Sequence, residues 1–183
     1  MLGWKSPFVR KLKVVIAGGG VAALETALAL HELAGDRVKL TLLAPTPDFV
    51  YRPIAVLEPF VHRPPRQLPL ATFAAELHAT LVQDTVATVD CERRVVRTGS
   101  QRELAYDVLV IAVGARVGEV LGDAVAMDVS RMDESLHGLV EEIDGGAVRS
   151  LAFVAPTPTW PLPVYEVAPV SYTHLTLPTS DLV

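Results

Sequence analysis

The chain has 183 residues, which is enough for one complete domain and the beginning of a second. Half of the residues are hydrophobic and 20% are charged, a composition typical of a globular protein and not of a disordered one. The formal net charge of −5 gives no attraction to nucleic acid, so we expect no nucleic-acid partner. Cys91 is the only cysteine in the sequence, which excludes an internal disulfide and a cysteine-rich metal site; we predict no bound metal.

No apolar run reaches the roughly 18 to 20 residues of a membrane span. Residues 1–10 also lack the hydrophobic segment of a secretory signal. We therefore expect a cytoplasmic location, with peripheral contact to a membrane left open.

A glycine turn between a strand and a helix is the strongest local pattern. Residues 13–17 form a short β-branched run, and residues 21–34 form an apolar helical one. Between them, Gly18 and Gly20 occupy the first two positions of G-x-G-x-x-G/A, and Ala23 occupies the third. Gly18 permits a tight turn, Gly20 lets the backbone approach a pyrophosphate, and the N–H groups at the helix start favour that anion. The pattern predicts a dinucleotide site.

A second strand, residues 37–43, completes a βαβ unit. In many dinucleotide sites an acidic residue at the end of this strand holds the ribose. Ala44 and Pro45 stand in that place, which argues against a standard NAD site. Asp48 follows slightly later and could substitute for that acid, but the interpretation that we favour is an exposed turn residue.

Beyond residue 50 the pattern predicts short helices over 54–60 and 72–80. Residues 106–113, YDVLVIAV, predict a central buried strand that ends at Gly114. Strands of a small antiparallel layer are expected over residues 81–90, 94–98 and 104–105.

The remaining sequence is less regular. Residues 116–129 are predicted to be an irregular connection, and residues 133–144 a helix that stops at Gly145 and Gly146. Residues 149–155 predict another strand. The prolines of PTPTWPLP, residues 156–163, argue against a regular helix there.

Three segments together resemble the pyridine nucleotide-disulfide oxidoreductase superfamily of two-dinucleotide-domain flavoproteins. They are VVIAGGGVAALETAL at 14–28, DFVYRP at 48–53 and LAYDVLVIAVGA at 104–115. The second strand and the loop after it are most similar to those of sulfide:quinone oxidoreductases and type II NADH dehydrogenases. The resemblance implies an α/β fold with a Rossmann-like FAD-binding domain. Such a domain is a parallel sheet with helices on both faces and a small antiparallel layer, here truncated at the start of a second domain.

The resemblance also assigns roles around FAD. The glycine turn would hold the pyrophosphate, the segment after residue 111 would lie beside the flavin, and the strand near residue 85 would frame the adenine. The loop at 48–53 would shape the entrance to the flavin pocket, although a packed surface loop is an equal alternative. The implied cofactor-binding residues are Gly18, Gly20, Val21, Ala44, Arg52, Thr85, Val86, Ala112, Val113 and Gly114. No catalytic residue can be assigned.

Two features depart from the family. The chain lacks the pair of redox cysteines that a disulfide reductase needs, and Cys91 is interpreted as structural or incidental. The sequence at 149–169, where an NAD(P) domain would begin, has prolines where that domain has a glycine fingerprint. We therefore divide the chain into part of an FAD-binding domain at 1–116, a connection and helix at 117–148, and the start of a second region at 149–169.

Residues 170–179, VSYTHLTLPT, resemble the translation of a transposase-type sequencing adapter. We therefore expect residues 170–183 to be a tail that is not native, with an edge strand at 172–177 as the alternative. On this interpretation the gene is cut near Ala168 and Pro169, and the fragment alone is inactive.

The resemblance implies that the parent protein is an FAD-dependent oxidoreductase. It would pass a hydride or electron pair from a small-molecule donor through the flavin to a small-molecule, quinone-like acceptor. A dinucleotide-binding module without redox turnover and an NAD-dependent dehydrogenase are the alternatives.

Overall fold

A computed structural model describes residues 10–51, 60, 67–115, 124–127, 132–155 and 162–176 of the chain. The chain divides into two compact units. The first comprises Met1–Val50 and Gln67–Ala115, and the second comprises Tyr51–Arg66 and Arg116–Val183.

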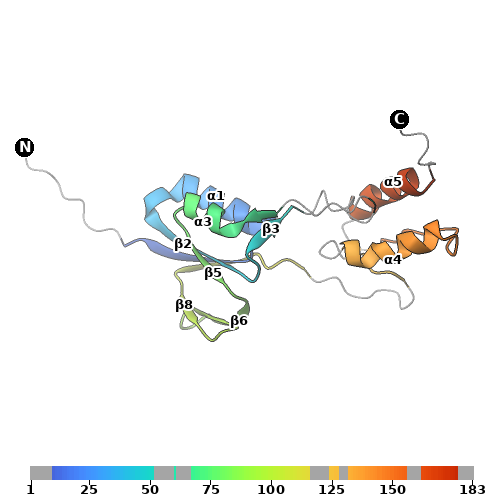
Figure 1. Ribbon diagram of the computed structural model, residues 1–183. Helices are drawn as coiled ribbons and strands as arrows, with labels where there is room; N and C mark the ends of the chain where they lie inside the picture. The colour runs from blue at the N-terminus through green and yellow to red at the C-terminus, as the bar shows by residue number, and fades with distance from the viewer. Residues whose placement is uncertain are drawn as a thin grey trace, which may run out of the picture. The chain divides into compact units, whose positions relative to one another are not determined.

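A four-stranded parallel sheet forms the centre of the first unit, in the order β5-β2-β1-β9 (Figure 1). Ala17 lies opposite both Leu43 and Ile111 in the register, and Ala44 lies opposite Gln83. All four strands therefore end at the same edge of the sheet. The strands are β1 (Leu12–Ala17), β2 (Val38–Ala44), β5 (Thr80–Gln83) and β9 (Val108–Ile111).

Two helices cover one face of this sheet, namely α1 (Val21–Ala34) and α3 (Leu70–Glu76), and the 3₁₀ turn η1 (Gly35–Arg37) leads from α1 into β2 (Figure 1). Leu40 and Leu42 of β2 pack there against Leu24 and Leu70. Alternate residues of a strand point to opposite faces, so both faces of β2 must be apolar to be buried.

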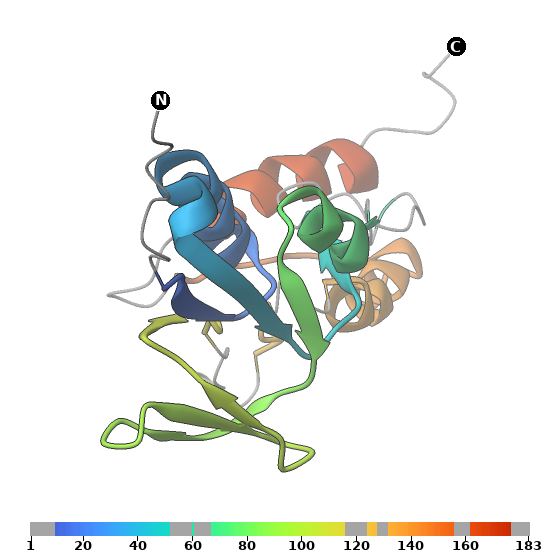
Figure 2. The ribbon, with the colours of Figure 1, turned by 90° about the vertical axis from the view of Figure 1, so that its left-hand side faces the viewer.

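A three-stranded antiparallel sheet covers the opposite face (Figure 2). Its strands are β6 (Val86–Asp90), β7 (Val95–Thr98) and β8 (Glu103–Ala105). Val96 of β7 packs against Val15, Leu43 and Val82 of the parallel sheet. A two-stranded antiparallel pair, β3 (Asp48–Val50) with β4 (Gln67–Pro69), completes the unit. The predicted fold class is confirmed. In the described part of the chain, helices cover one face of the parallel sheet, and the antiparallel layer covers the other face, where helices were also expected.

Two predicted strands differ in detail. The expected strand over 81–90 is two strands, since it breaks at Asp84, and its first part joins the parallel sheet as β5. The strand expected over 106–113 is shorter, and β9 forms an edge of the parallel sheet instead of its centre. Val108 and Ile111 are accordingly 45% and 66% exposed.

The predicted helix over 72–80 is displaced toward the N-terminus. It begins at Leu70 and ends at Glu76, because His78 has a positive φ of 51° and Thr80 already belongs to β5. The predicted helix over 54–60 lies outside the described residues except for Phe60, as does the connection at 116–129 except for 124–127.

The second unit contains α4 (Met132–Asp144) and α5 (Leu162–Thr176), which contact each other through Leu136 and Val167. The helix predicted over 133–144 is confirmed, and Gly146 ends it with a φ of 75°. In the part of the chain that the structure describes, no helix is long and apolar enough to cross a membrane.

Two expectations for the second unit are wrong. Residues 149–155 form no strand, since no neighbouring strand pairs with them among the described residues. The helix α5 begins at Leu162, so the prolines do not prevent a helix at the last two positions of the proline-rich segment, whose residues 156–161 lie outside the described part of the chain. The helix also includes Pro169 and continues through Thr176, where the alternative expectation was an edge strand at 172–177. Pro163 is tolerated because the first turn of a helix does not use its N–H groups.

Candidate functional site

The glycine turn joins β1 to α1 at the carboxyl edge of the parallel sheet. Gly18 has a φ of 134°, and its N–H donates to the carbonyl of Leu43 at 2.8 Å. A Cβ at this position would lie 2.1 Å from the carbonyl oxygen of Ala112. Gly18 therefore provides the tight turn that the sequence predicted, because only glycine allows both this φ and this approach.

Gly19 is also closely packed, which the motif did not predict. A Cβ there would lie 2.9 Å from Cδ1 of Leu70 and 3.0 Å from Cβ of Ala44. The run of three glycines was the signal available in the sequence. The contact that makes a small residue suitable at Gly19 is with Leu70, about fifty positions away.

Gly20 differs from both, because a Cβ there would meet no atom within 4 Å. It precedes α1 and provides no side-chain cap. The first hydrogen bonds recorded at this helix end run from the N–H groups of Ala23 and Leu24 to the carbonyl of Gly20. This pattern leaves the N–H groups of Val21 and Ala22 available to an anion, at the positive end of the helix dipole.

The structure brings other predicted residues to the same edge. Ala112 follows β9, and its N–H donates to the carbonyl of Ala17 at 2.7 Å. Val113 is 63% exposed, and Gly114 has a φ of 76° with open space where a Cβ would lie. The segment after β9 thus starts beside Gly18 and continues over an open surface.

The position expected for a ribose-binding acid is filled by apolar groups. Ala44 is fully buried, and its carbonyl accepts the N–H of Asp84 at 3.0 Å. Pro45 has no N–H to donate. Asp48, interpreted from sequence as an exposed turn residue, is instead half-buried and begins β3 opposite Pro69.

The predicted adenine segment lies at the end of β5. The N–H of Thr85 donates to Oδ1 of Asp84 at 2.7 Å, and its carbonyl accepts the N–H of Gly99 at 3.0 Å. Val86 is half-buried and packs against the core around Val96. Both backbone groups of Thr85 are therefore already used within the protein, an arrangement that depends on Gly99 and could not be read from the local sequence.

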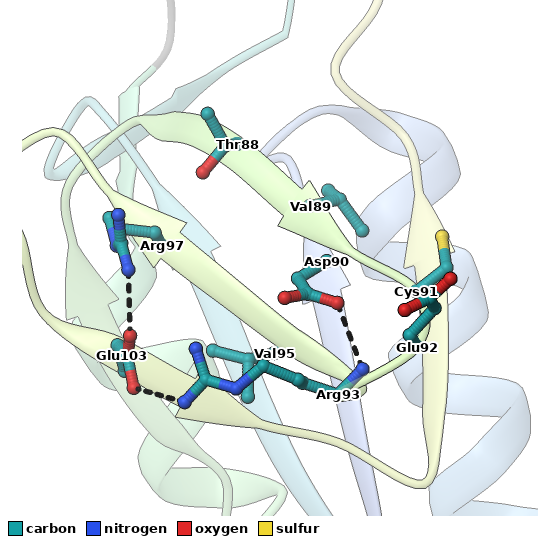
Figure 3. Close-up of a pocket in the computed structure, with 9 residues that line it drawn as sticks. All are labelled: Thr88, Val89, Asp90, Cys91, Glu92, Arg93, Val95, Arg97 and Glu103. Carbon is teal, nitrogen blue, oxygen red and sulfur yellow. Dashed lines mark hydrogen bonds and ion pairs between the residues drawn. The ribbon is translucent and has the colours of Figure 1, made fainter.

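Two residues singled out from the sequence, Arg52 and Cys91, are not among the residues that the structure describes at this edge of the sheet. Arg52 is outside the described residues. Cys91 is exposed in the turn between β6 and β7, where it lines an open hollow on the antiparallel sheet (Figure 3). In that hollow Glu103 accepts a hydrogen bond from Arg97 at 2.9 Å and pairs with Arg93 at 3.6 Å. Both arginines of the hollow thus pair with Glu103. No group of metal-binding side chains occurs in the described part of the chain.

The residues at the carboxyl edge fit a dinucleotide. Gly20 and the helix N–H groups match a pyrophosphate, because the backbone there is uncovered and carries partial positive charge. The Ala112–Gly114 segment offers backbone at the same edge for the remainder of the molecule. A glycine turn at a helix start, on the carboxyl edge of a parallel sheet, defines a Rossmann-type dinucleotide-binding domain.

Comparison with known proteins narrows this class. The family model for pyridine nucleotide-disulphide oxidoreductases matches residues 12–136, and the chain belongs to this family of FAD-dependent oxidoreductases. The expectations of family and of FAD as the family cofactor are confirmed.

Individual relatives agree with the family. The sulfide-quinone reductase of Aquifex aeolicus is 30% identical over 106 residues, which cover 57% of this chain and 24% of the relative. The crystal structure of the sulfide:quinone oxidoreductase from Aquifex aeolicus aligns with a TM-score of 0.64 and 26% identity, over 73% of this chain and 32% of that one. NDH2 from Plasmodium falciparum shares the fold, with a TM-score of 0.58 and 19% identity over 78% of this chain and 32% of that one. The chain thus spans 24% to 32% of the length of these relatives.

Proposed function

We propose that the whole protein is an FAD-dependent oxidoreductase that transfers reducing equivalents from a small-molecule donor to a quinone-like acceptor. The chain would supply the surface that binds the FAD pyrophosphate. The observation that carries this proposal is the uncovered backbone of Gly20 at the start of α1. Family membership supports the choice of FAD over NAD.

The residues of this chain would act by binding and orienting the cofactor. Gly20, Val21 and Ala22 would donate backbone N–H groups to the pyrophosphate. Thr85 and Val86 would border the adenine, and Val113 and Gly114 would lie beside the flavin. Bound FAD supplies the redox chemistry, since its isoalloxazine accepts a hydride or an electron pair and returns the electrons to an acceptor.

The identity of the electron acceptor is the more specific part of the proposal. A quinone is supported by the similarity to a sulfide-quinone reductase, of which this chain covers only 24%. Quinones are apolar, so such an acceptor implies that the whole protein contacts a membrane surface peripherally.

A flavin spectrum of the purified whole protein tests the proposal. We expect the absorbance of bound FAD, anaerobic bleaching by a reductant such as sulfide or NADH, and recovery of the colour on addition of a soluble quinone. Bound flavin that no donor bleaches would instead favour a dinucleotide-binding module without turnover. A protein that binds NAD but no flavin would contradict the proposal.

A further inference from the structure

A cluster of hydrogen bonds, which we name the Asp84 clasp, ties the end of β5 to the turn between β7 and β8. It consists of Asp84, Thr85, Thr98, Gly99 and Ser100. Asp84 accepts the N–H of Thr85 on Oδ1 at 2.7 Å, and on Oδ2 the N–H of Ser100 at 3.2 Å together with the Ser100 hydroxyl. The N–H of Gly99 donates to the carbonyl of Thr85 at 3.0 Å. Two segments sixteen positions apart are thus held by one carboxylate and one backbone bond.

The clasp is closely packed as well as hydrogen-bonded. A Cβ on Gly99 would lie 2.5 Å from Oγ1 of Thr85, so a larger residue there would force the Thr85 side chain or the turn to move. Thr98 is fully buried, and its Oγ1 accepts the N–H of Arg102 at 3.1 Å. Hydrogen bonds led by that from the Ser100 hydroxyl hold the pKa of the Asp84 carboxyl far below its usual range. Bonds to an ionised acceptor are about twice as strong as neutral ones, so the hydrogen bonds of the clasp are stronger while Asp84 is ionised.

The clasp lies at the carboxyl edge where the dinucleotide would bind. The N–H of Asp84 donates to the carbonyl of Ala44, the residue in the place of the ribose-binding acid. The Asp84 carboxylate bonds to the Ser100 turn, so its two oxygens already have three donors and it does not replace that acid. Its effect is instead on Thr85, the start of the predicted adenine segment.

We propose that Asp84 is a positioning residue for the adenosine half of the dinucleotide. By fixing both backbone groups of Thr85, the clasp would present the Thr85–Val86 segment as a preformed wall. Ala44 offers no carboxylate to the ribose, so the shape of this wall would carry much of the recognition of adenosine. A preformed wall favours binding because no ordering cost arises when the ligand arrives. This inference rests on the proposed function.

The affinities for FAD and FMN separate positioning from general stability, because FMN lacks the adenosine half. The whole protein, stripped of flavin, is titrated with each by fluorescence quenching. Asp84→Asn keeps an acceptor for Thr85 but places an amide group against the N–H of Ser100. We expect about tenfold weaker FAD binding and FMN binding within about twofold of wild type.

Asp90→Asn is the matched control. Asp90 also accepts a turn N–H, that of Arg93 at 2.8 Å, at the other end of β6. We expect Asp90→Asn to leave the ratio of FAD to FMN affinities unchanged. If Asp84→Asn does not fold, Ser100→Ala removes only the hydroxyl donor and should lower the ratio in the same direction.

Equal weakening of both flavins, or unchanged FAD affinity in the folded variant, would overturn the positioning role while leaving the proposed function intact. A wild-type protein that binds neither flavin would overturn both.

Discussion

Gly18→Ala should destabilise the first unit strongly, whereas Gly20→Ala should not. At Gly18 the φ of 134° is unfavourable for alanine and costs about 1–3 kcal/mol. The added Cβ would also lie 2.1 Å from the carbonyl oxygen of Ala112, which must move and strain the 2.7 Å bond between the Ala112 N–H and Ala17. Weakening that bond adds about 1 kcal/mol. The expected loss is therefore about 2–4 kcal/mol, a large share of the roughly 5–15 kcal/mol that stabilises a domain.

Gly20→Ala is the matched control for this prediction. The φ of Gly20 is −89°, which alanine adopts, and its Cβ would meet nothing within 4 Å. Alanine is a poorer N-cap than glycine, so we expect a loss below about 1 kcal/mol. Urea denaturation of the chain, followed by circular dichroism, measures both variants. A Gly18→Ala variant that is no less stable than Gly20→Ala would contradict the role of Gly18 in the turn.

Two further predictions concern the core and acid stability. Leu70→Ala, at a fully buried residue beside Gly19, should cost about 2–5 kcal/mol in urea denaturation, while Leu68→Ala, 45% exposed, should cost less than about 0.5 kcal/mol; similar losses would show that Leu70 is not a core residue. Hydrogen bonds from Ser100 and from the Lys13 N–H lower the pKa of Asp84 and Asp107 respectively, so the folded state binds fewer protons than the unfolded state. This stabilisation is complete above the ordinary aspartate pKa of about 3.9 and is lost at lower pH. The urea concentration at the midpoint of unfolding should therefore decrease when the pH is lowered from 6 to 3. A midpoint that does not change with pH would contradict the assignment.

The sequence predicted the part of the site that depends on neighbours in the chain. The strand, glycine turn and helix from Leu12 to Ala34 follow from local periodicity and from the need for glycine at a tight turn. The roles of Gly18 and Ala23 were predictable for this reason, since the fully buried Ala23 packs as the motif requires.

Features that depend on distant partners were missed or misplaced. Residues 81–83 read as part of an antiparallel layer, although they pair in parallel with β2. An apolar sequence shows that a strand is suited to burial but does not identify its neighbours, which is why β9 was expected at the centre and lies at an edge. The role of Asp84 could not be predicted from its neighbours in the sequence, because its partner Ser100 lies sixteen positions away.

The affinity of the whole protein for FAD, compared between wild type and Gly20→Ala, tests the central claim most directly. The uncovered backbone at Gly20 would receive the pyrophosphate, so a methyl group there should exclude it. Calorimetric titration of the flavin-free proteins should show FAD binding to wild type and at least about tenfold weaker binding to Gly20→Ala, with thermal unfolding of the two apoproteins nearly the same. Equal affinity of the two proteins for FAD would contradict the claim.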